Sequence, residues 1–320
     1  MIRSISLRKL YLAGAVALLG IGTLTAATDP AAYFRQAPTL VNPEKAPIYA
    51  ATQIGKQSVA VGDYGIILLG ETGGHLRQAQ VPTRAPLTGV HFIDEKHGWA
   101  VGHDGTILVS EDGGNRWSIQ REAPGSDEVL TSVWFESATH GLAIGQFGLA
   151  LQTDDGGKTW QEIRVAEGEA GERHLLQLVP AAHGVLLIAG EAGTLFRSTD
   201  AGRHWSTIQT TNKGSFWTGL ALTDGAILMA GMRGHIFRSD DAGLNWHEVA
   251  SGTQQSITGI RQHADGSIRL VGLSGANIIS KDGGHHFSSV PRPDRISLTA
   301  IAGDGNRDTL FTAIGAVIRD

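Results

Sequence analysis

Five aspartates recur at nearly constant intervals and have the clearest potential for chemistry: Asp112, Asp155, Asp200, Asp241 and Asp282. Successive members are 43, 45, 41 and 41 residues apart. Carboxylates repeated in this way could form a ring of metal ligands or supply the acid and base of a hydrolase. A residue type that recurs in every unit of a repeat protein usually does the same structural work in each unit. We therefore expect these carboxylates to hold turns.

Each aspartate lies in a motif of the form S/T-x-D-x-G-x-x-W/F, called the Asp frame below. The carboxylate can accept hydrogen bonds from backbone N–H groups that follow it, and the glycine can adopt a positive φ. The closing aromatic ring can pack against a neighbouring sheet. These closing residues are Trp117, Trp160, Trp205, Trp246 and Phe287. The frame predicts a tight turn between two strands.

A second motif, G-x-x-G between two apolar runs, predicts a hairpin. It begins at Gly62, Gly102, Gly145, Gly190, Gly231 and Gly272. These glycines open strands and not helices, which argues against a phosphate-binding loop. A further strand precedes each hairpin; Leu87-Thr88-Gly89-Val90 and Trp217-Thr218-Gly219-Leu220 are examples that align with each other. Another strand follows each Asp frame, which completes a four-stranded unit.

Four antiparallel strands in about 40 residues form the blade of a β-propeller. The sequence therefore predicts an all-β fold, a seven-bladed β-propeller of four-stranded antiparallel blades, as one domain over residues 47–320. A seventh unit begins at Ser297 and ends one strand short, which would leave an open sheet edge. Residues 28–46 are interpreted as a linker and closing strand, in which the N-terminal segment 37–41 completes the last blade.

The first 27 residues have the pattern of a secretory signal peptide. Arg3, Arg8 and Lys9 precede an apolar run, and small residues end the segment at Ala27. An uncleaved membrane anchor is the alternative, although the run is short for a span of roughly 20 residues. The chain has no cysteine, so disulfides and a lipid-modified cysteine are excluded. An exported protein of this kind is expected in the bacterial periplasm.

Charge and composition limit the kinds of partner. Without residues 1–27, 23 Lys and Arg face 31 Asp and Glu, a net charge of −8, and no basic run is visible. This balance argues against nucleic acid and against more than peripheral contact with a membrane. None of the 13 histidines shows a metal-ligand spacing, so we expect no metal and no cofactor. We expect a monomer.

The hairpin tips are the candidate binding residues. In a propeller, turns between second and third strands share a face with the loops that join blades. The tips are Asp63, Tyr64, His103, Asp104, Gln146, Phe147, Glu191, Met232 and Arg233. Their mixture of acidic, aromatic, Met and Arg side chains is typical of a protein-binding surface. The alternative is that exposed turns vary freely. Trp134 and Trp217 lie in first strands near the expected channel, where ligand stacking is the alternative to core packing.

The frames resemble the Asp-box, or bacterial neuraminidase repeat. The string HGWAVGHDGTILVSEDGGNRW, from His97 to Trp117, resembles the repeat of the photosystem II stability and assembly factor family. That resemblance implies a non-catalytic assembly factor. The acidic charge and the absence of a lipidation cysteine favour the non-photosynthetic bacterial branch, whose members are expected to assist an envelope membrane complex such as an RND-type exporter.

A glycoside hydrolase acting on a glycan is the alternative function, because sialidases carry the same boxes. A sialidase requires a tyrosine nucleophile late in the ring, but the four tyrosines are Tyr11, Tyr33, Tyr49 and Tyr64. A glycosidase with two catalytic carboxylates stays open, with Asp63, Asp104 and Glu191 as candidates.

Overall fold

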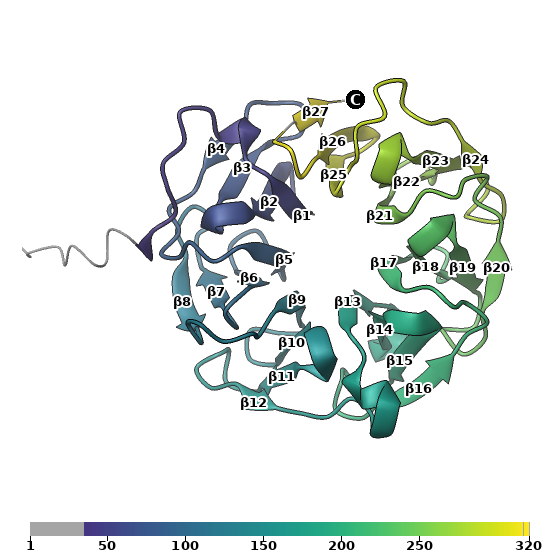
Figure 1. The fold of residues 1–320 in the computed structure, drawn as a ribbon, viewed down its shortest axis with the longest axis horizontal. Helices are drawn as coiled ribbons and strands as arrows, with labels where there is room; N and C mark the ends of the chain where they lie inside the picture. The colour runs from purple at the N-terminus through teal and green to yellow at the C-terminus, as the bar shows by residue number, and fades with distance from the viewer. Residues whose placement is uncertain (1–34, 316, 320) are drawn as a thin grey trace, which may run out of the picture. The chain divides into compact units, whose positions relative to one another are not determined.

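The computed structural model describes residues 35–315 and 317–319, so the predicted signal peptide lies outside the described residues. Arg35–Asp320 forms one compact unit, and its sheets stand around a common centre (Figure 1). The prediction of an all-β, seven-bladed propeller is confirmed. No described helix is long and apolar enough to cross a membrane.

The first four blades each contain four antiparallel strands. Blade 1 consists of β1 (Ile48–Ile54), β2 (Gln57–Gly62), β3 (Ile67–Glu71) and β4 (Arg77–Gln78). Blade 2 consists of β5 (Leu87–Phe92), β6 (Gly98–Gly102), β7 (Ile107–Ser110) and β8 (Ser118–Arg121). Blade 3 consists of β9 (Leu130–Phe135), β10 (Gly141–Gly145), β11 (Ala150–Thr153) and β12 (Gln161–Glu162). Blade 4 consists of β13 (Leu175–Pro180), β14 (Leu186–Gly190), β15 (Thr194–Ser198) and β16 (Ser206–Gln209).

The remaining blades follow the same order, and the last is shorter. Blade 5 consists of β17 (Phe216–Ala221), β18 (Ile227–Gly231), β19 (Ile236–Ser239) and β20 (His247–Val249). Blade 6 consists of β21 (Ile257–Gln262), β22 (Ile268–Gly272), β23 (Asn277–Ser280) and β24 (Ser288–Ser289). Blade 7 consists of β25 (Ala300–Asp304), β26 (Arg307–Phe311) and β27 (Val317–Arg319).

Short 3-10 turns supply the helical residues. They are η1 (Pro43–Lys45), η2 (Asp63–Gly65), η3 (Gln146–Gly148), η4 (Gly168–Glu172), η5 (Ala182–Gly184), η6 (Glu191–Gly193), η7 (Met232–Gly234) and η8 (Leu273–Gly275). Five of these, η2, η3, η6, η7 and η8, are the turns of G-x-x-G motifs. The first strand of each blade is innermost, and the chain steps outward from strand to strand (Figure 1).

The hydrophobic core lies between blades. The second and third strands of neighbouring blades interleave, as Val59 and Leu69 of blade 1 do with Ala100 and Leu108 of blade 2. The closing aromatic residue of each Asp frame joins the core shared with the preceding blade, as Trp117 does here. Trp160, Trp205, Trp246 and Phe287 repeat this placement around the ring. The aromatic residue recurs once per blade in the sequence because each blade packs on the preceding one in the same way.

The prediction that segment 37–41 completes blade 7 is wrong. Ala37 donates its N–H to the Val81 carbonyl at 3.0 Å, and the Gln78 amide holds both Pro38 O and Leu40 N. The segment is therefore fixed beside β4 of blade 1. Pro38 also lacks the N–H that a ladder position needs. Among the described residues, β27 pairs with β26 alone, so blade 7 has three strands.

The ring is closed instead by η1, by side chains and by the Ile48 N–H, which donates to the Thr312 carbonyl at 3.0 Å. The Glu44 carboxylate accepts the Leu76 N–H at 2.8 Å and forms an ion pair with Arg319 of β27. Hydrogen bonds of Glu44 with Leu76 and Arg319 outweigh the effect of burial and lower the pKa of this carboxyl. At the centre, the Thr299 hydroxyl donates to the Ile48 carbonyl at 2.6 Å. Blades 7 and 1 are thus joined both at the centre of the ring and at its outer strands.

Candidate functional site

The Asp frames form a common hydrogen-bond network in the loops between third and fourth strands. In the blade 5 frame, the buried Ser239 hydroxyl donates to Asp241 Oδ1 at 2.9 Å and accepts the Gly243 N–H at 2.9 Å. Asp241 Oδ1 also accepts the Asn245 N–H at 2.8 Å. The frames at Asp112, Asp155, Asp200 and Asp282 repeat this pattern. The structure places one such carboxylate on each of five blades and uses it to close a turn.

The same hydrogen bonds stabilise the ionised carboxylates. The Thr159 hydroxyl and N–H lower the pKa of Asp155 to about 2, and the N–H and side-chain amide of Asn245 lower that of Asp241 to about 2. His286 lowers the pKa of Asp282 through its N–H and ring. For Asp200, burial opposes ionisation, but hydrogen bonds from His204 and Ser198 outweigh it and lower the pKa. A carboxylate held in this way is a poor proton donor at neutral pH.

The frames predict a loss of stability in acid. A carboxyl with a lowered pKa contributes its full stabilisation above its unfolded pKa of about 3.9 and loses it as the pH falls toward the folded value. The melting temperature should therefore fall between about pH 4 and pH 2, the interval set by Asp155 and Asp241. Circular dichroism melts should show a shallower fall for Asp155→Asn, because an amide does not titrate. Identical slopes would contradict this role.

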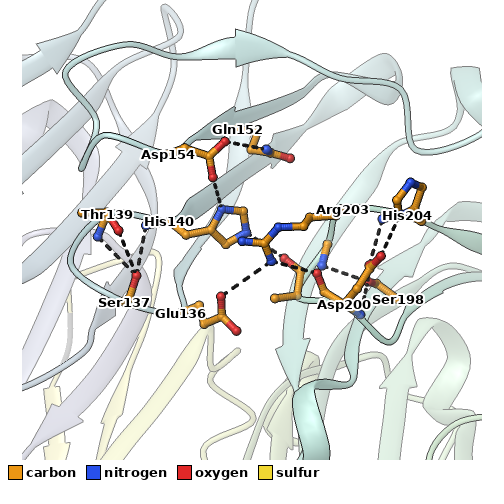
Figure 2. Close-up of polar contacts among 12 residues, drawn as sticks. Glu136, Ser137, Thr139, His140, Gln152, Asp154, Ser198, Asp200, Arg203 and His204 are labelled. Carbon is orange, nitrogen blue, oxygen red and sulfur yellow. Dashed lines mark hydrogen bonds and ion pairs between the residues drawn. The ribbon is translucent and has the colours of Figure 1, made fainter.

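Each frame also docks the preceding blade. The backbone carbonyl of the residue that follows the frame aspartate accepts a hydrogen bond from a side chain of the preceding blade. The donor–acceptor pairs are Gln57 and Gly113, Gln120 and Gly156, His140 and Ala201, Arg197 and Ala242, and Arg238 and Gly283. Figure 2 shows His140 of the third pair, which lies between Asp154 of its own blade and Asp200 of the next frame. The frames therefore help to hold neighbouring blades together.

The tips lie at the opposite ends of the strands and adopt strained turns. In blade 1, the Ile66 N–H donates to the Asp63 carbonyl, and Tyr64 and Gly65 both have positive φ, as in a type I′ turn. The central pair of each turn is thus the third and fourth residues of G-x-x-G. The third residues are Tyr64, Asp104, Phe147, Ala192, Arg233 and Ser274, all with φ between 53° and 57°.

This conformation favours Gly, Asn or Asp, and other residues incur a cost of roughly 1–2 kcal/mol. Tyr64 and Phe147 are nevertheless 57% and 67% exposed, so burial does not offset this cost. Arg233 is exposed in the same conformation, and its guanidinium group bonds no described residue. Residues held in a strained backbone often serve function. Ala201 and Ala242 of the Asp frames share this conformation, so the tips remain a candidate binding surface through their exposed side chains.

Three of the predicted tip residues meet in one pocket. Glu191 of blade 4 and Met232 and Arg233 of blade 5 line a cavity of about 610 Å³, together with Lys213 and the ion-paired His235 and Glu248. The His235 ring nitrogen lies 2.5 Å from Glu248 Oε1. Lys213 comes from the connector between blades 4 and 5, His235 directly follows η7, and Glu248 lies in β20, so none of them is part of a G-x-x-G motif. The pocket presents acidic, basic and apolar side chains together.

Two more tips belong to smaller groups. The Phe147 ring packs edge-to-face on His174 with centroids 4.6 Å apart, and the Phe147 N–H donates to His174 Nδ1. The His174 N–H in turn donates to Glu191 Oε2, which links the tips of blades 3 and 4. Gln146, beside Phe147, donates its N–H to the Val129 carbonyl. The surface is thus continuous from Phe147 to Arg233.

The tips of blades 1 and 2 lie apart from that pocket. Burial raises the pKa of the Tyr49 hydroxyl, and the charges of Asp63 and Tyr64 add to the effect, so these residues lie near one another. His103 and Asp104 adjoin an ion pair between Arg121 and Glu128. The candidate acids of the glycosidase alternative, Asp63, Asp104 and Glu191, thus stand on three different blades. No group of three or more His, Asp or Glu side chains in the described chain could hold a metal ion.

Comparison with known proteins agrees with the propeller fold. The model of the family described as photosynthesis system II assembly factor YCF48 matches residues 72–131 and 122–276. YCF48 bound to D1 peptide is similar with a TM-score of 0.69 at 20% identity, covering 89% of this chain and 94% of that one. YCF48 from Cyanidioschyzon merolae is similar with a TM-score of 0.68 at 16% sequence identity, and the match covers 89% of this chain and 98% of that one.

A catalytically inactive virginiamycin B lyase from Staphylococcus aureus, solved with quinupristin, gives a TM-score of 0.72 at 13% identity and covers 87% of this chain and 95% of that one. At such identities these likenesses show the fold alone. No curated protein matches the sequence significantly.

Proposed function

The chain belongs to the photosynthesis system II assembly factor YCF48 family, and from that premise we propose that it is a non-catalytic assembly factor that holds a protein partner on its tip face. The observation that carries this proposal is the set of strained, exposed tips, above all Tyr64, Phe147 and Arg233. A surface of exposed aromatic, Met and Arg side chains is suited to protein recognition. The peptide bound to a similar YCF48 structure supports a polypeptide ligand.

The finer features of the proposal come from the N-terminal sequence. The chain is exported through the signal peptide of residues 1–27 and acts as a monomer in the periplasm. Its partner is an envelope membrane complex such as an RND-type exporter, in keeping with the non-photosynthetic bacterial branch. The acidic net charge supports a protein partner over a nucleic acid or an anionic lipid surface.

The test is recovery of tagged protein from detergent-solubilised envelopes of the source bacterium. An assembly factor should enrich one membrane complex in amounts comparable to its own, whereas a hydrolase should enrich none and should turn over a member of a glycan panel. Glycan turnover that Asp104→Asn or Glu191→Gln abolishes would decide for the hydrolase. The neighbouring His103 and Met232, which carry no carboxylate, provide matched control substitutions to alanine for that assay.

A further inference from the structure

A bulge in the innermost strands aims one side chain per blade into the central channel. Pairing of the first and second strands skips one residue in each of blades 1 to 6, as between Leu87 and Gly89. The skipped residues, with Thr299 at the matching place before β25, are Tyr49, Thr88, Thr131, Leu176, Trp217, Thr258 and Thr299. All seven line one cavity of about 190 Å³. Bulges often re-aim side chains next to functional sites.

Four of these bulge residues are threonines with a structural task. Each hydroxyl donates to a carbonyl of the next blade: Thr131 to Leu175 at 2.6 Å, Thr258 to Leu298 at 2.8 Å, Thr299 to Ile48 at 2.6 Å, and Thr88 to Leu130. Blades 1, 4 and 5 depart from this pattern and carry Tyr49, Leu176 and Trp217. The residue before each of these, Ile48, Leu175 or Phe216, is at most 1% exposed, so the backbone position is retained.

In blades 1, 4 and 5 an apolar or aromatic side chain stands in place of the hydroxyl that joins neighbouring blades elsewhere. Tyr49 is 37% exposed, and Leu176 and Trp217 are half-buried. Trp134, the other first-strand tryptophan, packs against the core between blades 3 and 4 instead. Trp217 is therefore the first-strand tryptophan available to a ligand.

We propose that the mouth of the channel, lined by Tyr49, Leu176 and Trp217, binds one apolar or aromatic side chain of the partner polypeptide. This inference rests on the proposed function and adds to it the residue that the partner inserts. The bulges lie where the connectors between blades enter the first strands, the end of the channel that faces the tips. Tyr49 also lies near Asp63 and Tyr64 of the blade 1 tip. The channel mouth is thus continuous with the tip surface.

The size of the cavity suits a single apolar or aromatic side chain. The cavity measures about 190 Å³. Pockets for whole drug-sized ligands are typically about 300–1,000 Å³. A cavity of this size accommodates a single large side chain.

Unpaired N–H donors beside the cavity suit polar acceptor groups on either side of the inserted side chain. The Trp217 indole N–H and the Gln177 amide N–H groups bond no described residue, while Gln177 Oε1 is occupied by the Gly219 N–H at 2.9 Å. These donors can bond oxygen acceptors, which the carbonyls on either side of an inserted residue would supply. The site therefore fits an apolar residue within a peptide chain.

The test uses the full chain and N-acetylphenylalanine amide, a probe with one aromatic side chain and two carbonyls. Ligand-observed NMR should detect binding of millimolar affinity. Trp217→Thr should weaken it about tenfold or more. Because threonine occupies this position in four blades, the variant should keep the native melting temperature. Leu176→Thr should act in the same direction. Leu244→Thr, which changes an exposed leucine on the Asp frame of blade 5, should leave binding unchanged.

Unchanged probe binding in Trp217→Thr, with the fold retained, would overturn the proposal. So would preferential binding of methyl glucoside, which would assign the channel mouth to a carbohydrate. Neither outcome depends on recovering the partner. If the chain captures a membrane complex but does not bind the probe, the proposed site at the channel mouth is refuted. The proposed function is then unaffected.

Discussion

Replacing Asp308 with alanine should lower the free energy of unfolding by about 3–5 kcal/mol, the range for removing one partner of a buried ion pair. Asp308 lies in β26 and is 2% exposed. Its Oδ1 lies 2.7 Å from Arg261 Nη1, and its Oδ2 lies 2.8 Å from Arg269 Nη1 and 3.0 Å from His263 Nε2. Arg261 and Arg269 belong to blade 6, so the carboxylate joins the last two blades.

The cost arises because two guanidinium groups would keep their charge without the carboxylate that balances it. Chemical denaturation followed by tryptophan fluorescence measures the change. Asp127→Ala, which removes an exposed carboxylate from a connector, is the control and should change stability by less than about 0.5 kcal/mol. A loss below about 1 kcal/mol for Asp308→Ala would show that this cluster does not hold blade 7 in place.

Gly193→Ala should have the second-largest effect, about 2–5 kcal/mol, from two causes that add. Gly193 ends the G-x-x-G turn of blade 4 with φ +70°, which an L-residue adopts only with strain. A Cβ atom there would also lie 1.9 Å from the carbonyl oxygen of Asn212, so the connector between blades 4 and 5 must move. The same approach recurs at Gly148, where a Cβ would lie 1.8 Å from the Gly171 carbonyl.

Gly225→Ala separates the two causes. Gly225 has φ +89°, but nothing lies within 4 Å of the position that its Cβ would take. Its substitution should therefore cost only the backbone strain, roughly 1–2 kcal/mol. Equal losses of stability for the two variants, measured by the same denaturation, would show that the approach of the connector is unimportant.

The repeated part of the fold could be predicted because repetition reports shared geometry. Asp155 and Trp160 recur with a fixed spacing, and that spacing reflects one turn and one ring packed on the preceding blade. The prediction failed where the chain does not repeat. Segment 37–41 resembles an outer strand in sequence, but Gln78 holds it beside β4, and a contact 40 residues away leaves no pattern in the chain.

The candidate site shows a similar division. The tips were found because G-x-x-G marks them, but the sequence aligned Trp217 with Leu87, one residue away from its true register. In the structure Trp217 matches Thr88, and the strand pairing shows that both are the bulge residues of their blades. The donors that dock each frame, among them Gln120, His140 and Arg238, differ in type from blade to blade. Only the acceptor, a backbone carbonyl, is constant, and a carbonyl has no sequence signature.

The most direct test of the partner surface compares two charge reversals on opposite faces. Arg233→Glu changes an exposed tip, and Lys281→Glu changes an exposed residue of the blade 6 Asp frame by the same charge. The measurement is the amount of membrane complex recovered with each tagged variant, normalised to the native chain at equal melting temperature. Recovery should fall about tenfold or more for Arg233→Glu and stay unchanged for Lys281→Glu. Loss of the complex with Lys281→Glu alone would place the partner on the frame face and contradict the account.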